Sequence, residues 1–287
     1  MRASDGGGVV ITAYDDPRME LARQTVGAVH IVADPALPPH LLHLVDARGN
    51  AYFAKQHANR NRYAHEAHAY LTWGRHLQGH APELVGRQDS TRTLLLTAIH
   101  GQSGDVLPPG SAEEEQAHHN AGLVLGALHR ATAGPKAGGI GVELAGRLRG
   151  WVDRADRADL LSTDERRSLL QVADLLSHVQ LESAVCHLDY QPRNWLIGDG
   201  FWICDFEHMR RDARVRDFAR LEFRRWQAAP HLRSAFFAAY GRELSDAEQH
   251  LLESFGAIEA ATALVRGHEQ DDLALSAHGR TVLARLS

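Results

Sequence analysis

The sequence predicts an α+β protein, with an antiparallel sheet in its first third and mainly helices in the remainder. Three short apolar runs near the N-terminus are separated by turn-forming residues, which is typical of antiparallel strands. These runs span residues 26–32, 41–45 and 51–55. Three later segments begin with a serine followed three residues on by a glutamate, at Ser111, Ser162 and Ser245. This spacing is the capping box of a helix N-terminus.

The N-terminal elements can be placed in order. The turn residues Asp46-Ala47-Arg48-Gly49-Asn50 predict a hairpin that joins the second and third strands. A helical stretch from about 59 to 77 follows, and Thr93–Ile99 is apolar enough for a further strand. Lys55 ends the third strand, and Glu66 lies eleven residues on, inside the expected helix.

The second part of the chain shows helical spacing of its apolar residues. We expect a helix over 111–130, which ends where residues 133–141 introduce glycine and proline. A second helix should start after Ser162 and run to about Val179. A long helix should follow Ser245 as far as about Gly267, and a last one should begin near Leu273.

Composition limits the class of protein. The chain has 287 residues, of which 44% are hydrophobic and 23% charged, as in ordinary globular proteins. After His100 there are 21 Lys/Arg and 27 Asp/Glu, so this part is acidic by six charges, which argues against nucleic-acid binding. No run of 18 apolar residues is present and the N-terminus lacks a signal-peptide core. We therefore expect a cytoplasmic protein without a membrane span.

The two cysteines, Cys186 and Cys204, each lie in an apolar run. We expect both to be reduced thiols that pack in core strands as small hydrophobic side chains. A zinc site would need more ligands at suitable spacing.

The segment 185–207 carries the polar residues that indicate chemistry. His187, Asp189 and Asn194 precede a predicted hairpin with a Gly-Asp-Gly turn, and Asp205 and Glu207 follow it. The hairpin should return Asp205 towards Asn194, with Asp189 beside both. Carboxylate and amide oxygens are suitable ligands for Mg²⁺, which leaves room for phosphate oxygens.

The pattern H-x-D-x-x-x-x-N, followed by D-F-E, resembles the catalytic segment of aminoglycoside phosphotransferases and choline-kinase-like small-molecule kinases. Protein kinases share the first pattern but have D-F-G, so Glu207 favours the small-molecule branch. The resemblance implies a two-lobed protein-kinase-like fold. Residues 1–100 would form the N-terminal nucleotide-binding lobe, and 101–287 a helical lobe that holds the catalytic and acceptor-binding residues.

The resemblance assigns roles to five residues. Asp189 would be the catalytic base that accepts or orients the hydroxyl proton. Asn194 and Asp205 would hold Mg²⁺ against the phosphates, Lys55 would contact the α/β-phosphates, and Glu66 would orient Lys55. An inactive nucleotide-binding scaffold is the alternative, but it would not need all five residues.

Further roles follow from the same resemblance. The backbone of Ala98, Ile99 and His100 would pair with the purine of ATP or GTP, although an edge strand running into a turn is equally consistent. The segment Asp217-Phe218-Ala219 would brace the catalytic loop through its aspartate.

Three neighbouring side chains of the catalytic segment have less definite roles. His187 should brace the loop by hydrogen bonds. Arg193 either neutralises the γ-phosphate or faces solvent, and Glu207 would contact a second metal or its waters.

The segment between the first two strands departs from the protein-kinase pattern. It reads ADPALPPH over residues 33–40, with three prolines and no glycine. Protein kinases use glycines there so that backbone N–H groups approach the phosphates, and proline has no N–H.

The acceptor is expected in the C-terminal lobe. Acidic residues there are candidates for binding a cationic or polyhydroxyl acceptor, and a solvated acidic face is the alternative: Glu259, Glu269, Asp271 and Asp272. The implied function is a small-molecule O-phosphotransferase that inactivates an aminoglycoside or sugar-nucleoside antibiotic. The alternative is a metabolic kinase for choline, homoserine or a methylthio-sugar.

Overall fold

The computed structural model describes residues 16–35, 37–77 and 79–286, which fall into two compact units. The first unit comprises the chain up to His100 together with Trp202–Glu207, and the second comprises Gly101–Phe201 and the chain from His208 onward. A single division after His100 was predicted from the sequence, whereas in the structure the chain returns to the first unit at Trp202–Glu207. The predicted catalytic segment is thus divided between the two units.

The first unit contains a five-stranded antiparallel sheet in the order β1-β2-β3-β5-β4. The strands are β1 (Val29–Val32), β2 (Leu41–Asp46), β3 (Ala51–Gln56), β4 (Leu84–Gln88) and β5 (Thr93–Thr97). The predicted turn joins β2 and β3, and the Asp46 carboxylate accepts hydrogen bonds from the backbone N–H groups of Arg48 and Asn50. Strand β4 was not predicted, because it is short, contains Gly86 and has an irregular register there.

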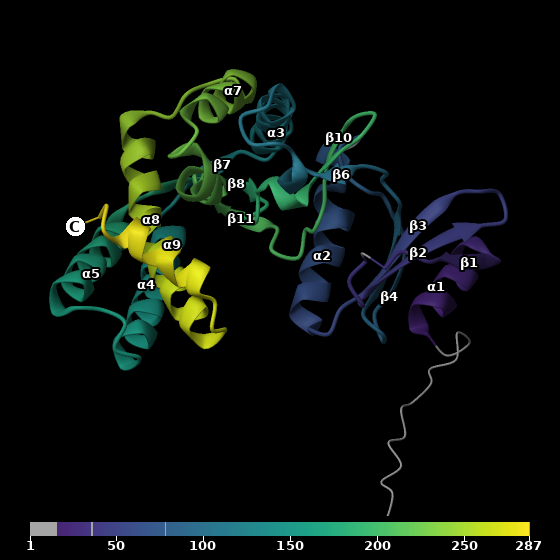
Figure 1. The fold of residues 1–287 in the computed structure, drawn as a ribbon, viewed down its shortest axis with the longest axis horizontal. Coiled ribbons are helices and arrows are strands. Elements are labelled where there is room, and N and C mark those ends of the chain that lie inside the picture. The colour runs from purple at the N-terminus through teal and green to yellow at the C-terminus, as the bar shows by residue number, and fades with distance from the viewer. Residues whose placement is uncertain (1–15, 36, 78, 287) are drawn as a thin grey trace, which may run out of the picture. The chain divides into compact units, whose positions relative to one another are not determined.

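Two helices accompany this sheet, α1 (Pro17–Val26) and α2 (Arg60–Trp73). Figure 1 shows α1 lying against the strands, where its Met19 and Leu21 join the apolar core of the sheet. The prediction that a strand begins at Val26 was wrong, because Val26 is the last residue of α1. Helix α2 is capped by Asn59 and continues into a short 3-10 turn that ends at Leu77, so it covers the predicted range.

The second unit contains several short strands. They are β6 (Gln102–Ser103), β7 (Gly134–Ala137), β8 (Leu181–Cys186), β9 (Trp195–Ile197) and β11 (Arg210–Ala213), while β10 (Phe201–Ile203) crosses the unit boundary. Strands β11, β8 and β7 form one antiparallel sheet, in which Arg210 pairs with Cys186. The last residue of β8 and the first residue of β11 therefore lie side by side at the same end of the sheet. The loop that follows β8 leaves from that end.

Helices make up most of the second unit. They are α3 (Ala112–Ala131), α4 (Gly138–Arg157), α5 (Thr163–His178), α6 (Arg216–Leu221), α7 (Pro230–Tyr240), α8 (Asp246–Glu269) and α9 (Leu273–Leu283). Helix α3 packs on α7, α4 packs on α5 and on α8, and α8 packs on α9 (Figure 1). Helix α4 was not predicted, because its first residues lie in the glycine-rich stretch that was expected to interrupt helical structure.

The capping predictions were correct at two of three positions. Ser162 and Ser245 form complete capping boxes with the glutamates three residues on. Ser111 caps α3 through its own hydroxyl, but the Glu114 carboxylate accepts from the Gly110 N–H and pairs with Arg225.

The two cysteines occupy different environments. Cys186 is buried in β8, as predicted. Cys204 is only partly buried and follows the last residue of β10, so its assignment to a core strand was wrong. Among the described residues, no helix combines the length and apolar character needed to cross a membrane.

Candidate active site

A buried lysine organises the polar residues of the first unit. Lys55 lies on β3, and its ammonium nitrogen is 2.7 Å from Glu66 Oε2 on α2 and 2.8 Å from Asp205 Oδ1. Glu66 Oε2 also lies 2.8 Å from His57 Nε2. The predicted Lys55–Glu66 pair is therefore formed, and Asp205 joins it through the segment that returns to this unit.

The surroundings keep both members of the Lys55–Glu66 pair charged. Burial raises the pKa of Glu66, but Lys55 and a hydrogen bond from His57 outweigh it, so that the pKa lies below its usual value. Burial lowers the pKa of Lys55, but the charges of Glu66 and Asp205 outweigh burial, so that the pKa lies above its usual value. A cation is thus held firmly at the end of β3, where a polyanionic ligand could contact it.

The Asp205-Phe206-Glu207 segment is anchored by its middle residue. Phe206 is buried and packs edge-on against Tyr70 of α2, with ring centroids 5.0 Å apart. Asp205 adopts a left-handed backbone with φ of 68°, a conformation that aspartate tolerates better than most side chains. The Glu207 carboxylate lies 3.1 Å from Arg62, and burial, followed by the nearby Asp205, raises its pKa.

The proline-rich connection between β1 and β2 has backbone carbonyl groups that are bonded within the first unit. The Pro38 carbonyl accepts from Leu41 N–H, and the Pro39 carbonyl accepts from the Arg18 side chain at 2.6 Å. At the end of this segment, burial and the charge of Lys55 lower the pKa of His40. The connection therefore reaches the neighbourhood of Lys55 without a glycine-rich phosphate cradle.

The residues expected to contact a purine follow β5. Ala98 donates its backbone N–H to the Ala51 carbonyl, which continues the pairing of β5 with β3. Ile99 and His100 lie beyond the strand, and the His100 ring is 6.1 Å from that of His43. A purine contact through an N–H group would thus involve Ile99 or His100 rather than Ala98.

In the second unit, Asp189 lies in the loop after β8 and is 1% exposed. Its carboxylate contacts four side chains. Gln191 Nε2 and Arg193 Nη2 lie at 2.7 Å, Asn194 Nδ2 at 2.9 Å and Arg220 Nη1 at 3.0 Å. Neither Gln191 nor Arg220 was predicted from the sequence, and Arg220 could not have been found from spacing because it comes from α6.

These contacts keep Asp189 ionised. Burial raises its pKa, but Arg220 and Arg193 outweigh that effect and lower the pKa to about 2. A carboxylate with so low a pKa is a good hydrogen-bond acceptor and a weak proton acceptor. It can therefore orient a hydroxyl group, which is the main requirement in phosphoryl transfer through a loose transition state.

A second aspartate holds the loop in place, as predicted for Asp217. Its carboxylate accepts from the N–H groups of His187 at 2.8 Å and Leu188 at 2.6 Å, and His129 Nε2 lies 3.1 Å away. Leu188 has a left-handed backbone with φ of 63°, which is unfavourable for a leucine. His187 also contributes to the loop, since its Nδ1 accepts from the Asp189 N–H at 3.3 Å.

The acidic residues proposed for the acceptor have contacts within the second unit. Glu259 lies 2.6 Å from Arg224 and 3.2 Å from His278, and these residues outweigh the effect of burial to lower its pKa to about 2. Asp272 caps α9 by accepting from the Leu275 N–H.

The two remaining acidic candidates lie at the end of α8. Glu269 pairs with Arg154 at 2.5 Å. Asp271 is exposed, with a left-handed backbone between α8 and α9.

Comparison with known proteins agrees with these observations. The model of the phosphotransferase enzyme family matches residues 41–251. No curated protein sequence shows a significant match to the chain.

Several solved structures resemble this chain over nearly their whole length. An aminoglycoside phosphotransferase from Alicyclobacillus acidocaldarius is 19% identical, with 93% of this chain and 94% of that chain covered and a TM-score of 0.59. A putative fructosamine-3-kinase from Thermobifida fusca is 20% identical, with coverage of 94% and 96% and a TM-score of 0.67. A choline/ethanolamine kinase family protein from Mesorhizobium loti is 18% identical, with coverage of 95% and 93% and a TM-score of 0.59.

These structural similarities show a fold shared with kinase-like phosphotransferases. The matched family residues include both the Lys55–Glu66 pair and the Asp189 loop. The chain therefore belongs to the phosphotransferase enzyme family.

Proposed function

We propose that this protein transfers the γ-phosphate of ATP or GTP to a hydroxyl group of a small acceptor molecule. The observation that carries the proposal is the buried, ionised Asp189, which is held by four side-chain donors in a loop braced by Asp217. A residue in this state orients an acceptor hydroxyl for in-line attack.

The first unit supplies groups for the nucleotide. Lys55, kept charged and positioned by Glu66, would contact the α- and β-phosphates. The backbone beyond β5, at Ile99 and His100, would contact the purine. Backbone contacts of this kind are compatible with both ATP and GTP.

The residues expected to hold Mg²⁺ have suitable chemistry. Asp205 provides a carboxylate whose side chain is 33% exposed, and Asn194 provides an amide oxygen. The Asn194 nitrogen donates to the Asp189 carbonyl and carboxylate oxygens, which fixes the orientation of the amide group. When bound, Mg²⁺ would neutralise the charge of the phosphates.

The chain's own residues would perform the remaining tasks. Asp189 would orient the acceptor hydroxyl and accept its proton late in the transfer, once the forming bond to phosphorus has made that proton acidic. Arg193 contacts Asp189 and its side chain is about half exposed; it would either balance charge near the γ-phosphate or face solvent. Glu207 would contact a second metal ion or its waters.

The family resemblance suggests antibiotics with aminoglycoside or sugar-nucleoside structures as acceptors, with metabolites such as choline, homoserine or a methylthio-sugar as the alternative. A screen that couples release of ADP or GDP to hydroxylated compounds of both classes tests the activity. We expect acceptor-dependent release in the wild type and almost none in Asp189→Asn, with Mg²⁺-nucleotide binding retained in both proteins. Nucleotide binding without acceptor-dependent release from any compound would favour an inactive scaffold.

A further inference from the structure

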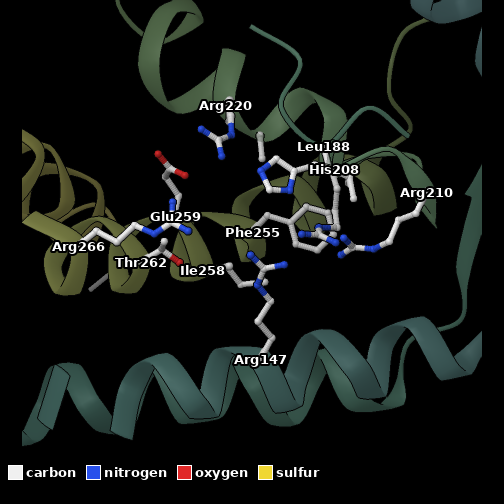
Figure 2. A pocket seen from close by; sticks show the side chains of 12 residues that line it. Arg147, Leu188, His208, Arg210, Arg220, Phe255, Ile258, Glu259, Thr262 and Arg266 are labelled. Carbon is white, nitrogen blue, oxygen red and sulfur yellow. The ribbon is translucent and has the colours of Figure 1, made fainter. Parts of the chain in front are cut away.

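A pocket in the second unit is lined by an unusual number of arginines. It has a volume of about 110 Å³, and its five arginines are Arg147, Arg210, Arg216, Arg220 and Arg266. One water needs on the order of 10–15 Å³ of such space, so the pocket can hold a group of several heavy atoms. Figure 2 shows that Arg147 rises from α4 and Arg266 reaches in from α8, while Arg210 approaches from another side.

The carboxylates around the pocket do not balance these arginines. Arg210 and Arg216 both contact the same carboxylate, that of Asp212. Within the described part of the chain, the side chains of Arg147 and Arg266 have no ion pair and no hydrogen bond; Arg266 lies only over the Trp151 ring, at 5.8 Å. Two guanidinium groups thus remain available to a ligand.

The acidic residue in the lining does not offset this excess. Glu259 already contacts Arg224 and His278, two cationic or potentially cationic side chains. Thr262 adds a neutral polar group to the lining, and its buried hydroxyl has no hydrogen-bond partner among the described residues. The free hydrogen-bonding capacity of the pocket is therefore mainly that of donors.

Burial and the charges of neighbouring arginines act together on Arg147. Arg147 is exposed as a whole residue, but burial of its guanidinium group, followed by the charges of Arg216 and Arg210, lowers its pKa to about 10. Like charges at short range destabilise one another, and a bound anion removes that repulsion. The geometry and the charge excess therefore indicate the same kind of ligand.

The pocket adjoins the loop of Asp189. Leu188, the residue before Asp189, is part of its lining, and Arg220 both lines it and contacts the Asp189 carboxylate at 3.0 Å. A molecule in the pocket would therefore lie next to the residue that orients the acceptor hydroxyl. The lining residues from α8, such as Phe255 and Arg266, lie beyond the residues matched by the family, which end at 251.

We propose that this pocket binds an anionic oxygen group, a phosphate or a carboxylate, on the acceptor whose hydroxyl is oriented by Asp189. This inference rests on the proposed phosphotransferase function and specifies its substrate class. Arg147 and Arg266 form charge-assisted hydrogen bonds with the anionic group, and Thr262 donates a further one. A polycationic acceptor would meet a pocket of the same charge.

The first arm of the test measures anion binding directly. Inorganic phosphate and acetate are each titrated calorimetrically into protein saturated with Mg²⁺-ADP, at constant ionic strength set with chloride. The proteins are the wild type, the double variant Arg147→Gln/Arg266→Gln, and Arg149→Gln. Arg149 is the matched control, because it lies on α4 but pairs with Asp174 instead of lining the pocket.

We expect saturable binding of phosphate, acetate or both to the wild type and to Arg149→Gln, with affinity reduced 10-fold or more in the double variant. Comparison of the two probes identifies which anionic group the pocket prefers. Binding that is equal in the double variant and Arg149→Gln, or that is absent from the wild type, would overturn the proposal.

The second arm separates this inference from the proposed function. With the acceptor found by nucleoside-diphosphate release, the double variant should raise the acceptor KM at least 10-fold and leave the nucleotide KM within about twofold. An unchanged acceptor KM, with normal turnover, would overturn the anionic acceptor while the phosphotransferase function stands. Absence of acceptor-dependent release, with arginine-dependent phosphate binding intact, would instead overturn the proposed function.

Discussion

The Lys55 cluster of the first unit and the arginine pocket of the second unit differ in whether their cationic side chains are paired with carboxylates. Lys55 is 9% exposed and contacts two carboxylates, those of Glu66 and Asp205. In the pocket, Arg147 and Arg266 contact no carboxylate of the described residues, and Arg147 is exposed. The Lys55 ammonium group is paired within the fold, whereas the guanidinium groups of Arg147 and Arg266 remain available to a ligand.

This difference separates residues that are held in place by the fold from residues that recognise a ligand. A buried cation must be paired, because an uncompensated charge in the interior costs several kcal/mol. Exposed arginines can remain unpaired at little cost, and they gain most when an anion arrives. Changes to the Lys55 cluster should therefore reduce stability, while changes to the pocket should reduce ligand affinity.

Asp189 is buried and paired, like Lys55, and it contacts Arg220 of the arginine pocket. Its substitution should have the largest effect. Asp189→Asn should lower kcat by roughly 10²–10⁴-fold, because the amide cannot accept the hydroxyl proton. Binding of Mg²⁺-nucleotide, followed by calorimetry, should stay near the wild-type value. Turnover within a few-fold of wild type would contradict the role of Asp189.

The Lys55 cluster should respond to loss of one carboxylate. Glu66→Gln should lower the free energy of unfolding by about 3 kcal/mol, because it breaks a buried ion pair. Denaturant unfolding of the variant measures this change. Glu83→Gln is the control, since Glu83 is exposed in the same unit; equal stability of the two variants would remove the distinction between the regions.

The charge around Glu259 should appear as a dependence of stability on pH. Its pKa is lowered to about 2 in the folded protein, so its contribution is fully present above the unfolded pKa of about 4.5 and is lost as the pH falls towards 2. The loss should be on the order of 3 kcal/mol, and Glu259→Gln should remove it. Glu253→Gln, an exposed change on α8, should leave the acid limb of the stability curve unaltered.

The smallest effect on stability is expected at Arg147. Arg147→Gln should change the free energy of unfolding by less than about 0.5 kcal/mol, because the residue is exposed and has no partner among the described residues. A slight gain is compatible with relief of repulsion from Arg210 and Arg216. A loss of several kcal/mol would mean that Arg147 supports the fold rather than a ligand.

The sequence predicted the parts of the protein that depend on neighbouring residues in the chain. Apolar runs and turn residues located β2, β3 and β5, and serine caps located α5 and α8. Helix α4 was missed because its glycine-rich start favours irregular structure, and β4 because its apolar pattern is broken by Gly86.

The candidate site shows the same limit. The family resemblance paired Lys55 with Glu66, but Arg220 reaches Asp189 only because the fold places α6 beside the catalytic loop. The arginine pocket was hidden by composition. The chain after His100 is acidic by six charges, which is compatible with a cationic acceptor or a solvated acidic surface, yet the fold collects arginines from α4, β11, α6 and α8 in one pocket. Net charge gives no information about such local arrangements.

The most direct test of the account is a measurement of acceptor-dependent nucleoside-diphosphate release across hydroxylated compounds in three charge classes. Sugars with a phosphate or carboxylate, neutral sugars and nucleosides, and polycationic aminoglycosides are compared at equal concentration and ionic strength. We predict that the highest kcat/KM falls in the anionic class and drops at least 10-fold in Arg147→Gln/Arg266→Gln. The highest kcat/KM for a polycationic aminoglycoside, unchanged in the double variant, would contradict the account.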